Sequence, residues 1–145
     1  MKPDHLEEFL NSPIGDCKHF KWKEALWLPT WQIHVLPDED VAKNIIETAK
    51  KMEAIRSILG KKIIVTSWYR PSEYNKAIGG AKLSAHQEGL ACDFYVKGIT
   101  SDAVREILLD FLSRLDIRME DLEGANWVHI DLKSPSKNGK RFFIP

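Results

Sequence analysis

One long amphipathic segment constrains the fold more than any other part of the sequence. Between Asp38 and Leu59, apolar side chains recur every three or four residues, as they do along one face of an α-helix. The acidic run 38–40 suits the positive N-terminal end of a helix, and Gly60 supplies a stop. We therefore predict a helix from about Asp38 to Leu59. Its apolar stripe consists of Val41, Ile45, Ala49, Met52, Ile55 and Leu59.

Three further segments predict other parts of the core. Ile63–Thr66 and Cys92–Val96 predict two strands. Between these strands, the stretch 69–80 is rich in turn residues. Ser101–Leu115 predicts a second amphipathic helix. The apolar positions of this helix are Val104, Ile107, Leu108, Phe111, Leu112 and Leu115.

The last predicted strand, about Asn126–Lys133, alternates strictly between two kinds of side chain. Val128, Ile130 and Leu132 fall on one face of the strand, and Trp127, His129 and Asp131 fall on the other. Because the apolar face belongs to the core, we expect His129 to point towards a cleft or solvent.

The order of these elements indicates the fold class and the domain organisation. Helices packed on a mainly antiparallel sheet give an α+β fold. No repeat or long linker interrupts the chain, so we expect residues 1–145 to form a single domain. Within it, residues 37–145 form the core, and residues 1–36 form an aromatic-rich wrap. We expect this wrap to hold a short helix near Asp4–Leu10 and then irregular chain.

Composition removes several classes of function. Lys and Arg together number 21, as do Asp and Glu, so no basic surplus indicates nucleic acid or an anionic membrane as a partner. No stretch approaches the roughly 18 apolar residues that span a bilayer. The N-terminus is acidic where a secretory signal is basic, so we expect synthesis in the cytoplasm without a signal peptide. Cys17 and Cys92 are too few for a disulfide scaffold, and we expect two free thiols.

Two histidines and one aspartate form the candidate site. His86 and Asp93 flank Gly89, a small residue that lets the chain turn tightly, and Asp93 begins a strand expected beside the His129 strand. Three protein ligands leave the fourth tetrahedral position of a zinc ion open, as in catalytic sites. Taken singly, a histidine on a strand such as His129 is more often an ordinary core or surface residue. Asp93, taken singly, is as readily the buried ion-pair partner of an Arg or Lys.

The motifs around these residues resemble a known family, the M15 zinc D-Ala-D-Ala carboxypeptidases and endopeptidases. The nearest branch resembles the small peptidases of phages and prophages. The resemblance covers about residues 63–133 and implies the fold shared with the signalling domain of hedgehog proteins. It also implies that His86, Asp93 and His129 bind Zn²⁺. The segments that carry it are Ser67-Trp68-Tyr69-Arg70-Pro71, 75–81, Ser84-Ala85-His86, Gly89, Ala91-Cys92-Asp93 and Trp127-Val128-His129.

The same resemblance assigns two roles in substrate binding. It makes Arg70 the group that binds a substrate carbonyl or carboxylate and stabilises the developing oxyanion, for which a planar, permanently charged guanidinium is suited. Ser84 resembles the serine of the family that hydrogen-bonds the substrate. The alternatives are a surface arginine in a turn and a serine that only caps a turn.

The general base is less clear from the sequence. Many M15 members carry an acidic residue three positions before the last histidine ligand, where this chain has Asn126. Glu123, six before His129, is the candidate that we favour, because small phage-type peptidases and hedgehog-type domains resemble this chain in that offset. The alternative is a solvated charge ahead of the strand. Asp131 is better suited to orient a histidine ligand.

These residues predict a zinc metallopeptidase that hydrolyses stem or cross-link peptides of bacterial peptidoglycan, as a carboxypeptidase or an endopeptidase. Without a signal peptide, a phage lysis enzyme (endolysin) released through a membrane lesion, or a component of the virion, fits best, and we expect a monomer. The main alternative is a non-catalytic zinc module of the same fold that binds a protein or the cell wall. Asn126 favours this alternative.

Overall fold

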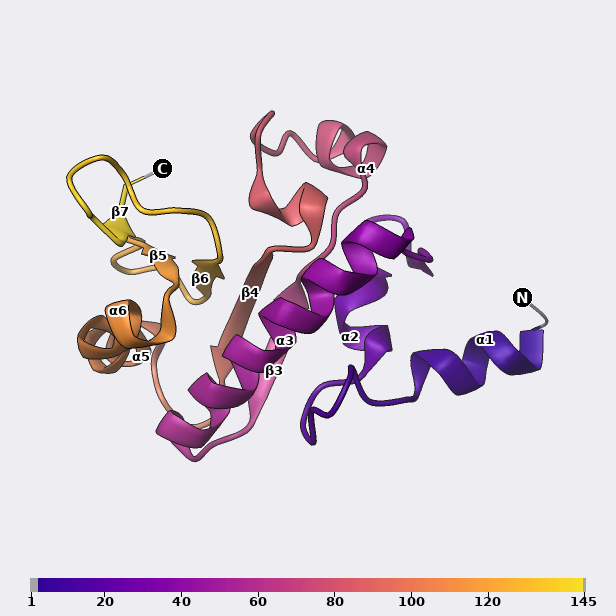
Figure 1. The fold of residues 1–145 in the computed structure, drawn as a ribbon, viewed down its shortest axis with the longest axis horizontal. Helices are drawn as coiled ribbons and strands as arrows, with labels where there is room; N and C mark the ends of the chain where they lie inside the picture. Colours follow the sequence, from indigo (N-terminus) through magenta and orange to yellow (C-terminus); the bar gives the residue numbers. More distant parts are fainter. Residues whose placement is uncertain (1–2, 145) are drawn as a thin grey trace.

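The computed structural model describes residues 3–144 (Figure 1). The α-helices are α1 (Pro3–Leu10), α2 (Trp22–Leu26), α3 (Glu39–Leu59), α4 (Ser72–Ala77), α5 (Ser101–Leu108) and α6 (Leu112–Leu115). Two 3₁₀ helices are η1 (Ala85–Glu88) and η2 (Leu109–Phe111). The strands are β1 (Trp27–Leu28), β2 (Ile33–His34), β3 (Ile63–Ser67), β4 (Ala91–Val96), β5 (Arg118–Glu120), β6 (Val128–Asp131) and β7 (Phe142–Phe143).

The main sheet has the strand order β3-β4-β6-β5-β7. All neighbours run antiparallel except β5 and β7, which are parallel. The predicted α+β class with a mainly antiparallel sheet is therefore confirmed. The pairing of β4 with β6 places Asp93 directly opposite His129. Sheet topology thus brings together two residues that lie 36 positions apart.

Helix α3 confirms the predicted amphipathic segment, and in Figure 1 it crosses in front of β3 and β4. Asp38 caps its N-terminus by accepting a hydrogen bond from the Val41 N–H at 2.8 Å. Gly60 ends it in the left-handed conformation, with φ of 65°. Most of the apolar stripe is buried in one core cluster with Phe94 of β4 and Ile130 of β6. Burial of this stripe holds the long helix against the sheet.

The second predicted helix, Ser101–Leu115, is not continuous. It ends at Leu108, passes through one turn of 3₁₀ helix, and resumes as α6. Phe111 interrupts the α-helical geometry, with φ of −110° and ψ of −8°. Ile107 lies before the interruption, within α5, where Val104 and Leu108 face the core and Ile107 is exposed, so the predicted stripe is wrong at Ile107. After the interruption, Leu112 is buried again.

The last predicted strand is shorter than expected, since only Val128–Asp131 pair in β6. His129 and Asp131 alternate with the core residues as predicted, yet both are buried, so the expectation that His129 faces a cleft or solvent is wrong. The ring of Phe143 lies 6.3 Å from that of His129, and Arg118 of the neighbouring strand β5 pairs with Asp131. Strands β5 and β7 are absent from the sequence prediction.

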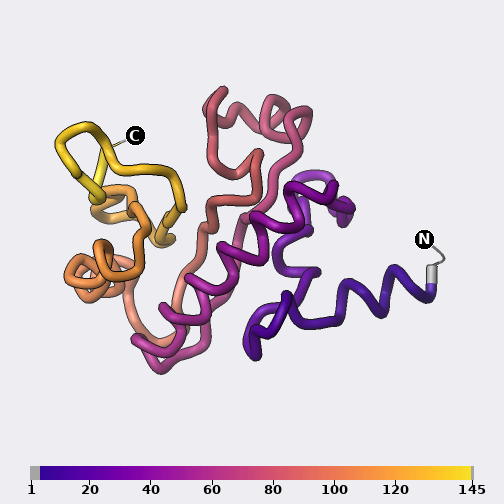
Figure 2. Tube along the Cα trace, viewed as in Figure 1, coloured from indigo at the N-terminus to yellow at the C-terminus, as the bar shows by residue number. Residues whose placement is uncertain are grey.

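The N-terminal segment contains more regular structure than predicted. Helix α1 matches the expected helix near Asp4–Leu10, but α2 and the β1–β2 pair lie within the stretch expected to be irregular. Helix α1 extends to one side, opposite the C-terminal strand (Figure 2). The turn-rich stretch 69–80 likewise contains α4, which begins directly after Pro71.

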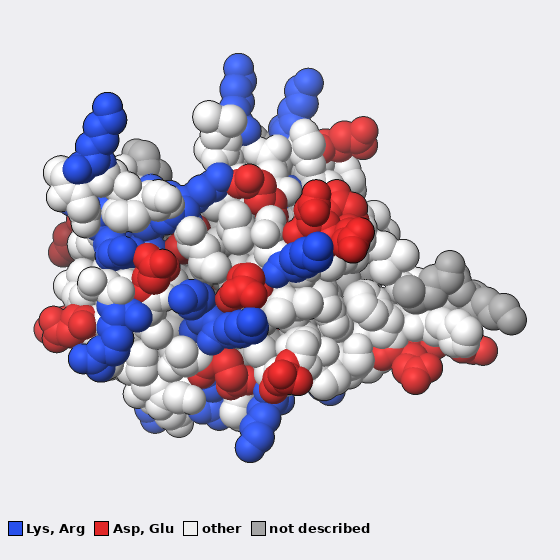
Figure 3. All heavy atoms as spheres, viewed as in Figure 1, with Lys and Arg blue, Asp and Glu red and all other residues white. Residues whose placement is uncertain are grey.

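The surface agrees with the even charge balance. On the face in Figure 3, basic and acidic side chains are interspersed. Within residues 3–144, no helix is both long and apolar enough to cross a membrane. Cys17 and Cys92 are both free thiols, as predicted, and both are buried. Burial raises the pKa of the Cys92 thiol well above its usual value.

Candidate metal centre

A tight turn places His86 at the base of the site. The 3₁₀ helix η1 carries this histidine, and Gly89 ends the helix with φ of 75°. A Cβ at Gly89 would lie 2.9 Å from Cγ1 of Ile45 and 3.2 Å from the carbonyl oxygen of Val41. The turn therefore packs against α3 through a position that only glycine fits, as the sequence suggested for this residue.

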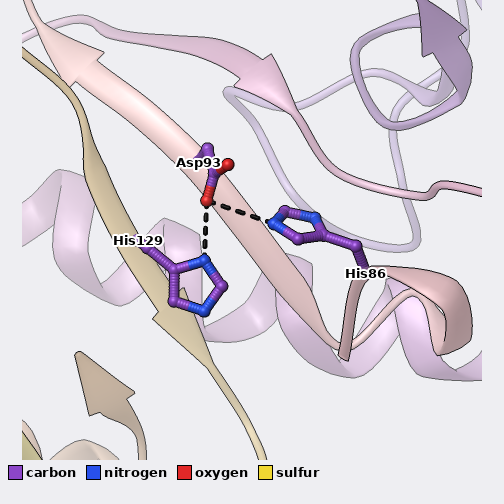
Figure 4. A group of neighbouring side chains, drawn as sticks. All are labelled: His86, Asp93 and His129. Carbon is purple, nitrogen blue, oxygen red and sulfur yellow. Dashed lines mark hydrogen bonds and ion pairs between the residues drawn. The ribbon is translucent and has the colours of Figure 1, made fainter. Parts of the chain in front are cut away.

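Three buried side chains converge at the centre of the sheet (Figure 4). Oδ1 of Asp93 lies 2.7 Å from Nδ1 of His129 and 3.2 Å from Nε2 of His86. The side chains come from η1, β4 and β6, and each residue is at most 8% exposed. The structure thus brings together the three ligands proposed from the sequence.

The outer nitrogen of each histidine is fixed by an acceptor. Nδ1 of His86 donates to the Trp68 carbonyl oxygen at 2.6 Å, because a carbonyl only accepts. Nε2 of His129 donates to Oδ2 of Asp131 at 3.0 Å. Nε2 of His86 therefore carries a lone pair towards Asp93, and Nδ1 of His129 does the same when the neutral ring keeps its proton on Nε2. A carboxylate oxygen and two lone pairs at this distance require a cation between them.

This donor set fits a divalent metal ion. The three ligand atoms all lie within 4.8 Å of one another. Tetrahedral zinc with bonds of about 2.0 Å separates its ligand atoms by roughly 3.3 Å, so the side chains need only small shifts to bind it. Nitrogen and carboxylate ligands also accept other divalent ions, so the donor set alone leaves the metal's identity open.

The electrostatics of the site favour positive charge. Burial tends to raise the pKa of Asp93, but His86 and His129 outweigh burial and hold the pKa well below its usual range. Burial tends to lower the pKa of His129. The hydrogen bonds with Asp131 and Asp93 outweigh this effect and raise the pKa of His129 to about 9. In the metal-free protein, a proton thus takes the place of a metal ion.

Arg118 and Asp131 support His129 from behind. The guanidinium of Arg118 makes a bidentate pair with Asp131, at 2.8 Å from Nε and 2.9 Å from Nη2. It also lies over the ring of Phe143, 4.1 Å from the centroid. The predicted role of Asp131 as a partner of a histidine ligand is confirmed. Arg118 was missed, because β5 is too short to show a periodic pattern.

Arg70 contacts the ligand cluster directly. Its Nη2 lies 3.2 Å from Oδ2 of Asp93, and its Nε donates to Oγ of Ser67 at 2.8 Å. Arg70 thus lies beside the cluster and does not extend into solvent as an isolated surface arginine would. A hollow of about 410 Å³ opens beside Arg70 and Asp93. It is also lined by Thr66, Ser67, Tyr95, Asn126 and Trp127.

Ser84 lies at the start of η1 and caps it. Its hydroxyl oxygen accepts a hydrogen bond from the His86 N–H at 3.2 Å, and the side chain is half-buried. This contact is the turn cap considered as the alternative for this residue. A hydrogen bond from Ser84 to substrate stays a prediction.

Two glutamates lie near the ligand strand in different places. Glu123 is exposed and lines a separate hollow of about 430 Å³ with Asp102 and Arg105, and none of the described polar contacts joins it to the three ligands. Oε1 of Glu120, which the sequence did not single out, lies 3.8 Å from Nε2 of His129. Glu120 is the described carboxylate nearest to that nitrogen after Asp131.

An α+β fold thus presents a buried His-Asp-His cluster, suited to a metal ion, beside an arginine. A family model described as Peptidase M15 matches residues 20–131. The chain belongs to the M15 peptidase family, which is metal-dependent and acts on peptides. A search of curated proteins gives no match.

Proposed function

We propose that this chain is a zinc-dependent peptidase that hydrolyses peptide bonds in bacterial cell-wall peptidoglycan. The observation that carries the proposal is the buried cluster of His86, Asp93 and His129, whose three ligand atoms lie within 4.8 Å of one another. Membership of the M15 family supports peptide hydrolysis. Zinc, when bound, supplies a Lewis acid and lowers the pKa of water to about 7.

The side chains around the cluster suit the remaining tasks. Arg70 offers a fixed positive charge beside Asp93, where it would bind the substrate carbonyl or a terminal carboxylate and stabilise negative charge on oxygen. The adjoining hollow, with Tyr95 and Trp127 among its walls, would receive the substrate residue next to the scissile bond. Ser84 would hydrogen-bond the substrate backbone. Glu123 would take a proton from water and pass it to the leaving amine.

The substrate and the setting follow from the family resemblance. Stem or cross-link peptides containing D-amino acids are the proposed substrates, and the enzyme acts as a monomer. A phage lysis enzyme or virion component, which reaches the wall after release from the cytoplasm, is the proposed biological setting. The proposed single domain comprises residues 37–145 as the core that holds the metal and residues 1–36 as its wrap.

One observation favours the second candidate, a non-catalytic metal-binding module. Glu123 lines a hollow separate from the cluster, and Asn126 occupies the position where many relatives have an acid. In such a module, the metal ion would stabilise the fold or a binding surface. A measurement of turnover distinguishes the two functions, because only peptide hydrolysis requires a group that accepts a proton from water.

The test measures release of peptide fragments from purified peptidoglycan and the zinc content of the same samples. Glu123→Gln is expected to retain zinc and to lose at least about 100-fold in turnover. Glu120→Gln tests the second carboxylate, and Glu106→Gln, in the same hollow as Glu123, is the matched control. Absence of turnover in the zinc-loaded wild type would overturn the peptidase proposal and support the binding module.

A further inference from the structure

An ion pair on α5, between the buried Arg105 and the exposed Asp102, holds the segment that precedes the metal-binding strand. Arg105 is only 4% exposed. Its guanidinium donates to the carbonyl oxygens of Trp127 at 2.6 Å and Ala125 at 3.1 Å, and it pairs with Asp102 at 2.5 Å. Asp102 accepts a hydrogen bond from the Gly124 N–H at 2.9 Å. Two side chains thus fix three backbone groups within residues 124–127.

This segment, residues 123–127, carries side chains that line two hollows, one of which lies beside Asp93. It ends directly before β6, in which His129 is the second residue. Asn126 and Trp127 line the hollow beside Asp93, whereas Glu123 lines the neighbouring hollow. The position of all three side chains depends on the backbone that Arg105 holds.

Apart from these contacts, the described hydrogen bonds outside the sheet include one that holds this backbone, a turn bond from the Ala125 N–H to the Leu122 carbonyl oxygen at 2.8 Å. Residues 123–127 form no helix or strand, and Gly124 adopts the left-handed region, with φ of 85°. A Cβ at Gly124 would meet no atom within 4 Å, so packing does not hold this position. Burial of an arginine is unfavourable unless its N–H groups are satisfied. Here, the planar guanidinium satisfies two carbonyls in fixed directions, which a lysine could not do.

We propose that Arg105, held by Asp102, is a positioning residue that fixes residues 123–127 in the geometry required for turnover at the metal centre. The inference rests on the proposed function. Neither side chain contacts the three ligands among the described contacts, so metal binding does not depend on the pair. A displacement of about 1 Å in a reacting group costs roughly 100-fold in rate, so a small loosening of the segment has a large effect.

The experiment compares Arg105→Lys and Asp102→Ala with the wild type in three measurements. These are zinc content, hydrogen–deuterium exchange of residues 121–127, and kcat and KM on peptidoglycan peptides. We expect one zinc per chain, faster exchange in the segment, and a fall in kcat of about 10-fold to 100-fold. Asp102→Asn keeps an acceptor for the Gly124 N–H and is expected to restore part of kcat. Arg114→Lys, at an exposed arginine of α6, is the matched control.

Two results would overturn the proposal. One is exchange in the segment that equals that of the wild type. The other is faster exchange with kcat unchanged. If Arg105→Lys does not fold, Asp102→Ala decides alone, because the Asp102 side chain is 57% exposed and its truncation leaves no cavity. If the wild type cleaves no peptide, the proposed function fails, and the positioning role fails with it even where exchange rises. If the wild type is active and Arg105→Lys and Asp102→Ala have the same kcat as the wild type, only the positioning role is overturned.

Discussion

Asp131→Asn tests whether the carboxylate behind His129 sets the tautomer that binds metal. Asp131 accepts from Nε2 of His129 at 3.0 Å and from Arg118 at 2.8 Å and 2.9 Å. An asparagine keeps the size of the side chain but offers one acceptor oxygen and one NH₂ group. If the oxygen stays with Arg118, the NH₂ group faces Nε2 of His129, and this nitrogen must then accept. Nδ1 then holds the proton and loses the lone pair that faces Asp93.

The expected loss follows from this tautomer change. Substitution of a carboxylate behind a metal-binding histidine weakens metal binding by about 10-fold to 100-fold, which corresponds to about 1.4 to 2.7 kcal/mol. Loss of the negative charge beside Arg118 also lowers the free energy of unfolding. Because the Arg118 side chain is 22% exposed and stacks on Phe143, this loss is smaller than for a fully buried ion pair.

The assay is competition between the protein and a chelating dye for zinc, with thermal unfolding in excess chelator as the measure of stability. Asp116→Asn is the matched control. The Asp116 side chain is 74% exposed and forms an ion pair with Arg141 at 2.9 Å, and none of its described contacts involves a metal ligand. A zinc affinity of Asp131→Asn within twofold of the wild type would refute the reasoning.

Two further predictions concern stability. Gly89→Ala places a Cβ 2.9 Å from Ile45 in a left-handed turn and should lower the free energy of unfolding by about 2 to 4 kcal/mol. Gly60→Ala, which has open space around its Cβ, should lower it by only about 1 to 2 kcal/mol. Equal urea midpoints for the two variants would contradict this expectation. In the metal-free protein, His129 has a pKa of about 9, above the value of about 6.5 for an unfolded chain. The protonated histidine thus contributes stability that is complete below pH 6.5 and is lost as the pH rises towards 9, by about 1 kcal/mol per pH unit. Urea titrations in chelator at pH 6.5, 7.2 and 8 should show this decrease, zinc-loaded samples should not, and a flat metal-free profile would count against the pairing of His129 with two carboxylates.

Local signals predicted the parts of the fold that depend on local interactions. The stripe, cap and stop of α3 lie within one segment, and the turn from His86 through Gly89 to Asp93 spans eight residues. Short-range spacing is sufficient to locate such elements. The sequence also predicted that the Asp93 strand lies beside the His129 strand, whereas the register that sets the two residues opposite each other comes from the structure.

The rest depends on contacts between distant parts of the chain. Strands β5 and β7 have three and two residues, too few for a period, and they exist because they pair with β6 and with each other. Arg118 and Glu120 therefore gave no signal in the sequence. The surroundings of His129 likewise depend on Phe143 of β7 and Glu120 of β5, which come from other parts of the chain. Such pairings are set by tertiary structure and not by local propensity.

The central claim is that His86, Asp93 and His129 bind one catalytic metal ion. Elemental mass spectrometry of the purified protein, wild type against His86→Ala, tests it most directly. The account predicts about one zinc per chain in the wild type, regained after chelation and addition of zinc, and none in the variant. A wild-type protein that contains no metal and takes up none on addition of zinc would contradict the account.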